Sequence, residues 1–199
     1  MVKVKICGLS RPCDIDAVNA EKPEYVGFVF AESHRKVTPQ LAFDLRKMLD
    51  SGIIPVGVFV NEDPEYIVSL ARQGIIGVIQ LHGSENEEYI CGLKALTDKP
   101  VIKAVAVLND GDAQKWAKTS ADYLLLDGKA GGGGQSFDWD LIGKVEKPFF
   151  LAGGLCRENI GSALEKVKPF AVDASSGVET YGLKDPAKIR EFIRMVRNG

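Results

Sequence analysis

The chain has 199 residues, of which 45% are hydrophobic and 26% are charged, an ordinary balance for a globular protein. Its 25 Lys and Arg residues against 27 Asp and Glu residues give a formal net charge of −2. This charge excludes the strong positive field typical of proteins that bind nucleic acid or anionic membranes. No apolar run approaches the roughly 18 residues of a membrane span, and no secretory signal pattern begins the chain. We expect a cytoplasmic protein that forms a single domain over residues 1–199.

The cysteine pattern points away from disulfides and metals. The four cysteines are Cys7, Cys13, Cys91 and Cys156, and none belongs to a CxxC pair, so neither a disulfide framework nor a zinc site is expected. With only two histidines, a histidine-rich metal site is not expected either. Free thiols fit a reducing compartment.

Short apolar runs recur along the chain, and each ends near a glycine or a polar residue. Runs of this length, rich in β-branched residues, are typical of buried strands. They lie at residues 2–7, 25–30, 53–60, 75–82, 100–107, 122–127, 148–153 and 170–175.

Stretches of helical composition separate these runs. Thr38 and Asp63 each precede a proline, the favoured pattern of an N-cap followed by the first helical residue. We expect helices over residues 11–21, 39–50, 64–73, 86–96, 110–119, 138–144, 157–166 and from 186 to the end.

Alternating strands and helices predict parallel strands joined by right-handed crossovers. The number of repeats fits a small α/β protein of the (β/α)8 TIM-barrel type. A doubly wound open sheet is the competing architecture.

Polar side chains occur at the ends of several predicted strands. Because side chains alternate across a strand, Cys7, His82, Asp127 and Asp173 would all face the barrel interior at its C-terminal mouth, where such barrels carry catalytic groups. Each alone has a simpler explanation: a cysteine there often packs as a small apolar residue, and an aspartate often caps a turn. Lys5 shares a face with Cys7, and we expect its charge to favour the thiolate.

The last two repeats carry a phosphate-binding pattern. Gly153 and Gly154 follow the seventh strand, and Ser175, Ser176 and Gly177 follow the eighth. In these barrels the same two loops, with the N-terminus of a short extra helix, frequently bind phosphate through backbone N–H groups. We therefore expect a phosphorylated small-molecule ligand.

Arg35 follows the second strand in the stretch FAESHRKV. A guanidinium at this place can hold a second anion, such as a carboxylate, through two parallel hydrogen bonds. A solvated surface arginine fits the sequence equally well.

Several segments along nearly the whole chain form a specific set of motifs: KICG (5–8), GFVFAESHR (27–35), GVFVN (57–61), QLHG (80–83), a glycine loop leading to FDW (137–139), LAGGL (151–155), VDASSGVE (172–179) and GLKD (182–185). In their residues and their order, these segments resemble the phosphoribosylanthranilate isomerase family of tryptophan biosynthesis.

The resemblance implies an Amadori rearrangement of N-(5′-phosphoribosyl)anthranilate without metal or organic cofactor. It implies that Cys7 is the general base, Asp127 the general acid, and Arg35 the ligand of the anthranilate carboxylate. It also places His82 and Asp173 in the substrate pocket and gives phosphate binding to Gly153, Gly154, Ser175, Ser176 and Gly177. The glycine loop at 131–134 would close over the substrate, and the enzyme would be a monomer or a homodimer.

Two alternatives stay open. One is another phosphosugar-converting barrel enzyme, such as a histidine-pathway isomerase, which would be expected to carry an aspartate in place of Cys7, or an isomerase with dual-substrate activity. The other is a catalytically silent phosphosugar-binding subunit, against which the presence of both Cys7 and Asp127 argues.

Overall fold

The computed structural model describes residues 1–128 and 137–198. Each predicted apolar run contains one strand of a central barrel, so the predicted strands are confirmed. They are β1 (Lys3–Cys7), β2 (Tyr25–Val29), β3 (Ile54–Phe59), β4 (Val78–Leu81), β5 (Val101–Ala106), β6 (Tyr123–Asp127), β7 (Phe149–Leu151) and β8 (Ala171–Ala174).

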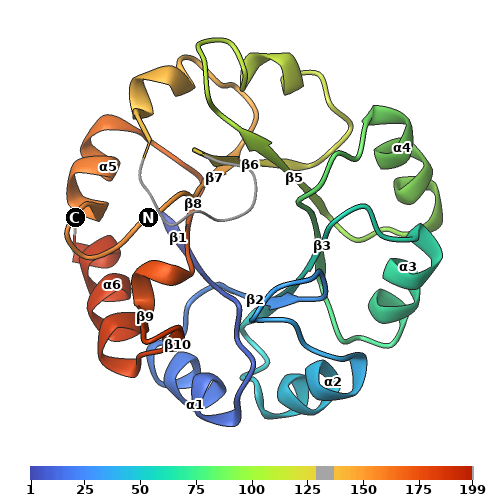
Figure 1. Ribbon diagram of the computed structural model, residues 1–199, viewed down its shortest axis with the longest axis vertical. Coiled ribbons are helices and arrows are strands. Elements are labelled where there is room, and N and C mark those ends of the chain that lie inside the picture. The colour runs from blue at the N-terminus through green and yellow to red at the C-terminus, as the bar shows by residue number, and fades with distance from the viewer. Residues whose placement is uncertain (129–136, 199) are drawn as a thin grey trace.

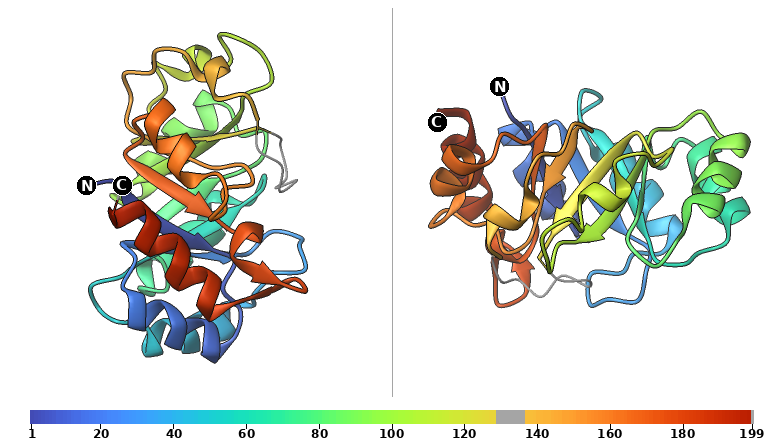
Figure 2. Two further views of the ribbon diagram at one scale, coloured as in Figure 1. Left: turned by 90° about the vertical axis from the view of Figure 1, so that its left-hand side faces the viewer. Right: turned by 90° about the horizontal axis from the view of Figure 1, so that it is seen from above.

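The strands form a closed parallel barrel in sequence order, seen end-on in Figure 1. The closing pair is β1 with β8, in which Lys5 lies opposite Asp173. Closure excludes the doubly wound open sheet, in which the first and last strands would not pair. It also brings the two ends of the chain to the same side of the molecule (Figures 1 and 2).

Helices surround most of the barrel. They are α1 (Pro12–Glu21), α2 (Pro39–Met48), α3 (Pro64–Arg72), α4 (Glu87–Leu96), α5 (Ile160–Lys166) and α6 (Pro186–Asn198). The predicted caps are confirmed, since Thr38 Oγ1 accepts from the N–H of Leu41 at 3.2 Å and Asp63 accepts from the N–H of Glu65 at 2.8 Å.

Two predicted helices are wrong. Residues 110–119 form only the 3₁₀ turn η1 (Gln114–Trp116), and residues 138–144 form only η2 (Trp139–Ile142). In the first segment only Ala113 and Trp116 supply apolar side chains that pack on the core, too few for the continuous apolar stripe that stabilises a surface helix. In the second, Gly143 takes a left-handed φ of 58° and ends the turn.

Away from the C-terminal ends of the strands, apolar side chains fill the interior of the barrel. Tyr25, Ile102, Leu125 and Phe150 belong to one buried cluster inside the strands, and the rings of Tyr25 and Phe150 meet edge to face with centroids 5.4 Å apart. This plug closes one end of the barrel, so an internal cavity can open only at the C-terminal ends of the strands.

After β8 the chain forms the short turn η3 (Ser176–Val178) and a small hairpin, β9 (Glu179–Thr180) with β10 (Leu183–Lys184). The hairpin and the loop after β2 project from the same end of the barrel (Figure 2). No helix among residues 1–128 and 137–198 is both long and apolar enough to cross a bilayer.

Candidate active site

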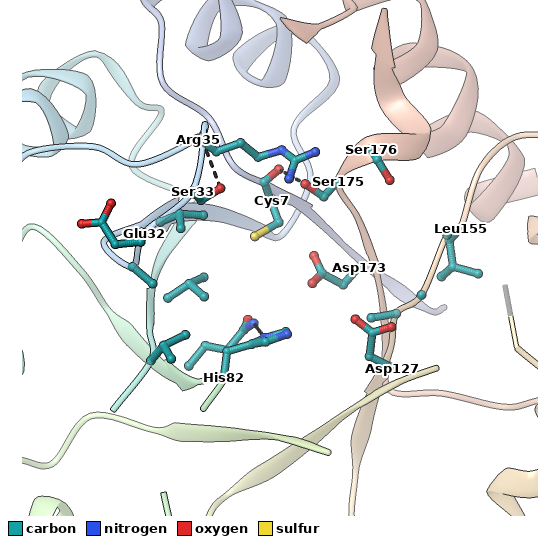
Figure 3. A pocket seen from close by; sticks show the side chains of 18 residues that line it. Cys7, Glu32, Ser33, Arg35, His82, Asp127, Leu155, Asp173, Ser175 and Ser176 are labelled. Atoms are coloured by element: carbon teal, nitrogen blue, oxygen red, sulfur yellow. Dashed lines mark hydrogen bonds between the residues drawn. The ribbon is translucent and has the colours of Figure 1, made fainter. Parts of the chain in front are cut away.

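A cavity opens at the C-terminal ends of the strands, and residues from distant parts of the chain line it. The predicted catalytic residues Cys7, on β1, and Asp127, on β6, face the cavity. His82, directly after β4, and Asp173, on β8, face it as well (Figure 3). Nine of the residues predicted for the site line this cavity: Cys7, Arg35, His82, Asp127, Gly153, Gly154, Asp173, Ser175 and Ser176.

A buried ion pair lies beneath the cavity. The Lys5 ammonium donates to both carboxylate oxygens of Asp173 at 3.0 Å, and Lys5 is fully enclosed. Burial alone would lower the pKa of Lys5, but Asp173 and Cys7 outweigh it and raise that pKa above its usual value. Lys5 therefore stays charged, and the pair joins β1 to β8 across the closure of the barrel.

The pKa of the Cys7 thiol is set by burial and by two neighbouring charges. Burial raises the pKa of Cys7 above its usual value, and the charge of Asp173 adds to this, while Lys5 lowers it. Lys5 thus acts in the expected direction, but desolvation of the thiolate is the larger effect. The predicted influence of Lys5 on the thiol is therefore confirmed in direction, although burial keeps the pKa of Cys7 above its usual value.

His82 is held as a neutral ring. Burial lowers the pKa of His82, and the positive charge of Lys5 lowers it further. Its Nδ1 lies 2.9 Å from the amide nitrogen of Gln80. Because an amide nitrogen only donates, the ring accepts at Nδ1 and carries its proton at Nε2.

The loops after β7 and β8 form one wall of the cavity. Gly153 and Gly154 have left-handed φ values of 88° and 61°, and a Cβ on Gly153 would lie 2.9 Å from an Asp127 carboxylate oxygen. Gly177 does not line the cavity. A Cβ there would lie 2.0 Å from the Leu155 carbonyl oxygen, so this glycine lets the two loops lie against each other.

Arg35 reaches over the cavity from the loop after β2 and is held in place by Glu179. Its Nε and Nη2 donate to the two carboxylate oxygens of Glu179 at 2.7 and 2.8 Å. The stem of Arg35 crosses Gly8, where a Cβ would lie 2.4 Å from Arg35 Cδ. The remaining guanidinium hydrogens are available to a bound carboxylate.

Glu179 has a second cationic partner, Lys184. The Lys184 ammonium donates to a Glu179 carboxylate oxygen and, at 3.0 Å, to the Ser175 carbonyl, and the Ser175 hydroxyl donates to the Cys7 carbonyl at 3.0 Å. Burial lowers the pKa of Lys184, which Glu179 partly offsets. This network connects the hairpin, the β8 loop, Arg35 and the end of β1.

Sequence reasoning missed Glu179, Lys184 and Gln80 as parts of the site. Both Glu179 and Lys184 occur in the segments that carry the family resemblance, but nothing local shows that Glu179 meets Arg35, 144 positions away. Gln80 lies on β4 two residues before His82, so the alternation of side chains that points to His82 also points to Gln80. Within the described ranges no group of His, Cys, Asp and Glu side chains is arranged to hold a metal ion.

Comparisons with known proteins show which family the chain belongs to. A family model described as "N-(5'phosphoribosyl)anthranilate (PRA) isomerase" matches residues 4–195. A relative from Endomicrobium trichonymphae named N-(5'-phosphoribosyl)anthranilate isomerase is 48% identical over 202 residues, covering 100% of both chains.

Solved structures show the same fold. The structure of monomers generated from the dimeric phosphoribosylanthranilate isomerase of Thermotoga maritima is 37% identical with a TM-score of 0.89, and a phosphoribosyl anthranilate isomerase in complex with reduced 1-(o-carboxyphenylamino)-1-deoxyribulose 5-phosphate is 37% identical with a TM-score of 0.88. Each alignment covers 100% of both chains. The chain therefore belongs to the N-(5'-phosphoribosyl)anthranilate isomerase family.

Proposed function

We propose that this chain catalyses the Amadori rearrangement of N-(5′-phosphoribosyl)anthranilate to 1-(2-carboxyphenylamino)-1-deoxyribulose 5-phosphate, a step of tryptophan biosynthesis. The observation that carries the proposal is the shared cavity. It places a thiol and a carboxyl group from opposite parts of the barrel beside a glycine-rich anion cradle on one wall and an oriented guanidinium on another.

The residues have distinct tasks in this reaction. Asp127 protonates the furanose ring oxygen, and the bond from that oxygen to C1′ breaks to give a Schiff base. The Cys7 thiolate then removes the C2′ proton, which gives an enolamine that tautomerises to the ketone. Return of a proton from the thiol to the carboxylate restores the starting state, so the overall reaction is an isomerisation.

The two anionic ends of the substrate fit the two ends of the cavity. Backbone N–H groups of the loops after β7 and β8, with Ser175 and Ser176 at the start of η3, bind the phosphate. Arg35 binds the anthranilate carboxylate with the guanidinium hydrogens that Glu179 leaves available. Asp173 keeps Lys5 charged below the thiol, and a charged Lys5 favours the thiolate.

The same proposal extends to the setting of the enzyme. Residues 1–199 act as one phosphoribosylanthranilate isomerase-like barrel domain in the cytoplasm, as a monomer or a homodimer, with a phosphoribosyl substrate and without metal or organic cofactor. The predicted closing loop at 131–134 lies outside the described residues.

A fluorescence assay with phosphoribosylanthranilate tests the activity directly. We expect the wild-type protein to turn the substrate over, and Cys7→Ser and Asp127→Asn each to lower kcat by at least roughly 10²-fold, the usual scale of general acid–base catalysis. Exposed Cys91 and Asp98 provide matched controls, and Cys91→Ser and Asp98→Asn should retain wild-type kcat. A protein that binds the substrate without turnover would be a silent binding subunit instead.

A further inference from the structure

Gln80 carries a buried polar atom without a partner at the wall of the cavity. Its side chain extends from β4 into the barrel, is only 1% exposed, and lines the same cavity as Cys7 and Asp127. No described residue hydrogen-bonds its Oε1. A buried acceptor left unpaired costs about 1–3 kcal/mol of desolvation, so an atom of this kind calls for an explanation.

Two other side-chain atoms in the described ranges share this condition, Gln114 Oε1 and Trp139 Nε1. Both belong to the irregular segments after β5 and β6, and neither residue lines the cavity. Gln80 differs because its side chain lines the cavity.

The other end of the Gln80 amide is already engaged. Its nitrogen donates to Nδ1 of His82 at 2.9 Å, and the lowered pKa of His82 keeps that ring neutral and able to accept. With the nitrogen engaged by the ring, the oxygen is the end of the amide that has no partner.

We propose that Gln80 is a substrate-binding residue whose Oε1 accepts a hydrogen bond from an O–H or N–H group close to the reacting carbons. The inference rests on the proposed function. At neutral pH the phosphate and carboxylate groups of that substrate only accept hydrogen bonds, so they cannot satisfy Oε1. The remaining donors are the sugar hydroxyls and the N–H that joins the sugar to the aromatic ring.

Gln80→Met tests this role, because methionine has nearly the same length and lacks the acceptor. The probe is reduced 1-(o-carboxyphenylamino)-1-deoxyribulose 5-phosphate, with its Kd measured by titration calorimetry. We expect the Kd to rise about tenfold, the fold-change of a single lost hydrogen bond. Gln114→Met is the matched control, since it removes another unpaired buried amide oxygen outside the cavity, and its Kd should equal that of the wild type.

A second experiment uses a His82→Phe protein. It separates a direct contact of Gln80 with the ligand from an effect that Gln80 exerts through His82. In a His82→Phe protein the Gln80 amide has lost its ring partner, so Gln80→Met should raise Tm there while still weakening the probe about tenfold. An unchanged Kd in this background would show that Gln80 acts only by orienting His82, and it would overturn the proposal. A fall in Tm would likewise favour a structural role and contradict it.

The source of the donor is distinguished by a second ligand in which an ether oxygen replaces the N–H of the probe. If the N–H is the donor, Gln80→Met weakens the amine ligand only, and if a hydroxyl is the donor, it weakens both ligands equally. Neither ligand weakened would overturn the proposal. Wild-type turnover of phosphoribosylanthranilate is measured in parallel, so that failure of the proposed function is recognised separately from failure of the Gln80 assignment.

Discussion

At the scale of single residues, the thiol and its surroundings set the pH range of the proposed reaction. Burial raises the pKa of Cys7 above its ordinary value despite Lys5. Most of the protein without substrate therefore holds the thiol form at neutral pH, and only the thiolate can remove a proton.

The activity of the wild-type protein should consequently rise with pH across the alkaline range. Cys7→Asp keeps a base at this position but replaces the thiol, whose ordinary pKa is about 8.5, by a carboxyl group, whose ordinary pKa is about 3.9. We expect the ascending limb of kcat/KM against pH to move to lower pH in this variant, with a lower plateau. An ascending limb at the same pH in both proteins would show that Cys7 is not the titrating base.

Glu179 is the shared anion of the buried Lys184 and the half-buried Arg35, and its removal should affect both stability and binding. Its side chain is 6% exposed and that of Lys184 is 2% exposed. Glu179→Gln leaves Lys184 without its counterion, so unfolding by urea should show a loss of about 3–5 kcal/mol. KM should rise as well, because Arg35 loses its two-point support.

An exposed pair gives the comparison for Glu179→Gln. Arg157 and Glu191 are 2.9 Å apart on the surface, and such pairs contribute about 0–1 kcal/mol. Glu191→Gln should therefore change neither KM nor stability beyond that range. Equal losses in both variants would rule out a special role for the buried network.

At the scale of elements, the end of β1 and the loop after β2 can pack closely because Gly8 has no side chain. Gly8 has a left-handed φ of 85° and lies under the stem of Arg35. The loop can hold the guanidinium over the cavity because nothing projects from this residue.

Gly8→Ala should therefore combine backbone strain with displacement of Arg35. Gly74, which follows α3, has a φ of 70° with no atom within 4 Å of a built Cβ, so Gly74→Ala isolates the strain alone. Both variants should lose about 1–2 kcal/mol of stability, the cost of placing a Cβ in the left-handed region. Only Gly8→Ala should raise KM, and an equal KM in the two variants would contradict this account of Arg35.

In the segments after β5 and β6, the local composition predicted helices that the structure does not form. Residues 110–119 and 138–144 have helical composition, yet the structure forms only η1 and η2 there. Helices in proteins are held mainly by an apolar face packed on a neighbour, and these segments have too short a face. The long α6 forms where the sequence predicted a helix, and its residues Ile189, Phe192, Ile193 and Val196 are all buried.

At the scale of the whole molecule, α6 completes the outer ring by packing against α1 and α5. On this helix Phe192 is fully buried, whereas Met195 is 41% exposed. Phe192→Ala should cost about 3–5 kcal/mol, and Met195→Ala should stay within about 0.5 kcal/mol. Thermal and urea unfolding measure both variants, and a small loss at Phe192 would mean that closure of the ring does not depend on α6.

Local sequence patterns predicted the strands and favoured the barrel class, and within a barrel they identified side chains that reach its mouth. Strand length, β-branched composition and period-2 parity are all properties of short segments. Parity alone therefore placed Cys7, His82, Asp127 and Asp173 on one inner face. The glycines after β7 and β8 were equally visible, because a glycine-rich turn after a strand is also a local pattern.

The interactions between these groups, in contrast, follow from the tertiary structure. The Arg35–Glu179–Lys184 network, the unpaired Gln80 oxygen and the raised pKa of Cys7 each depend on which residues barrel closure brings together and how deeply it buries them. Desolvation and contact between distant segments are properties of the packed chain. The sequence could identify a thiol near a lysine, but burial, which only the fold sets, is the larger influence on that thiol.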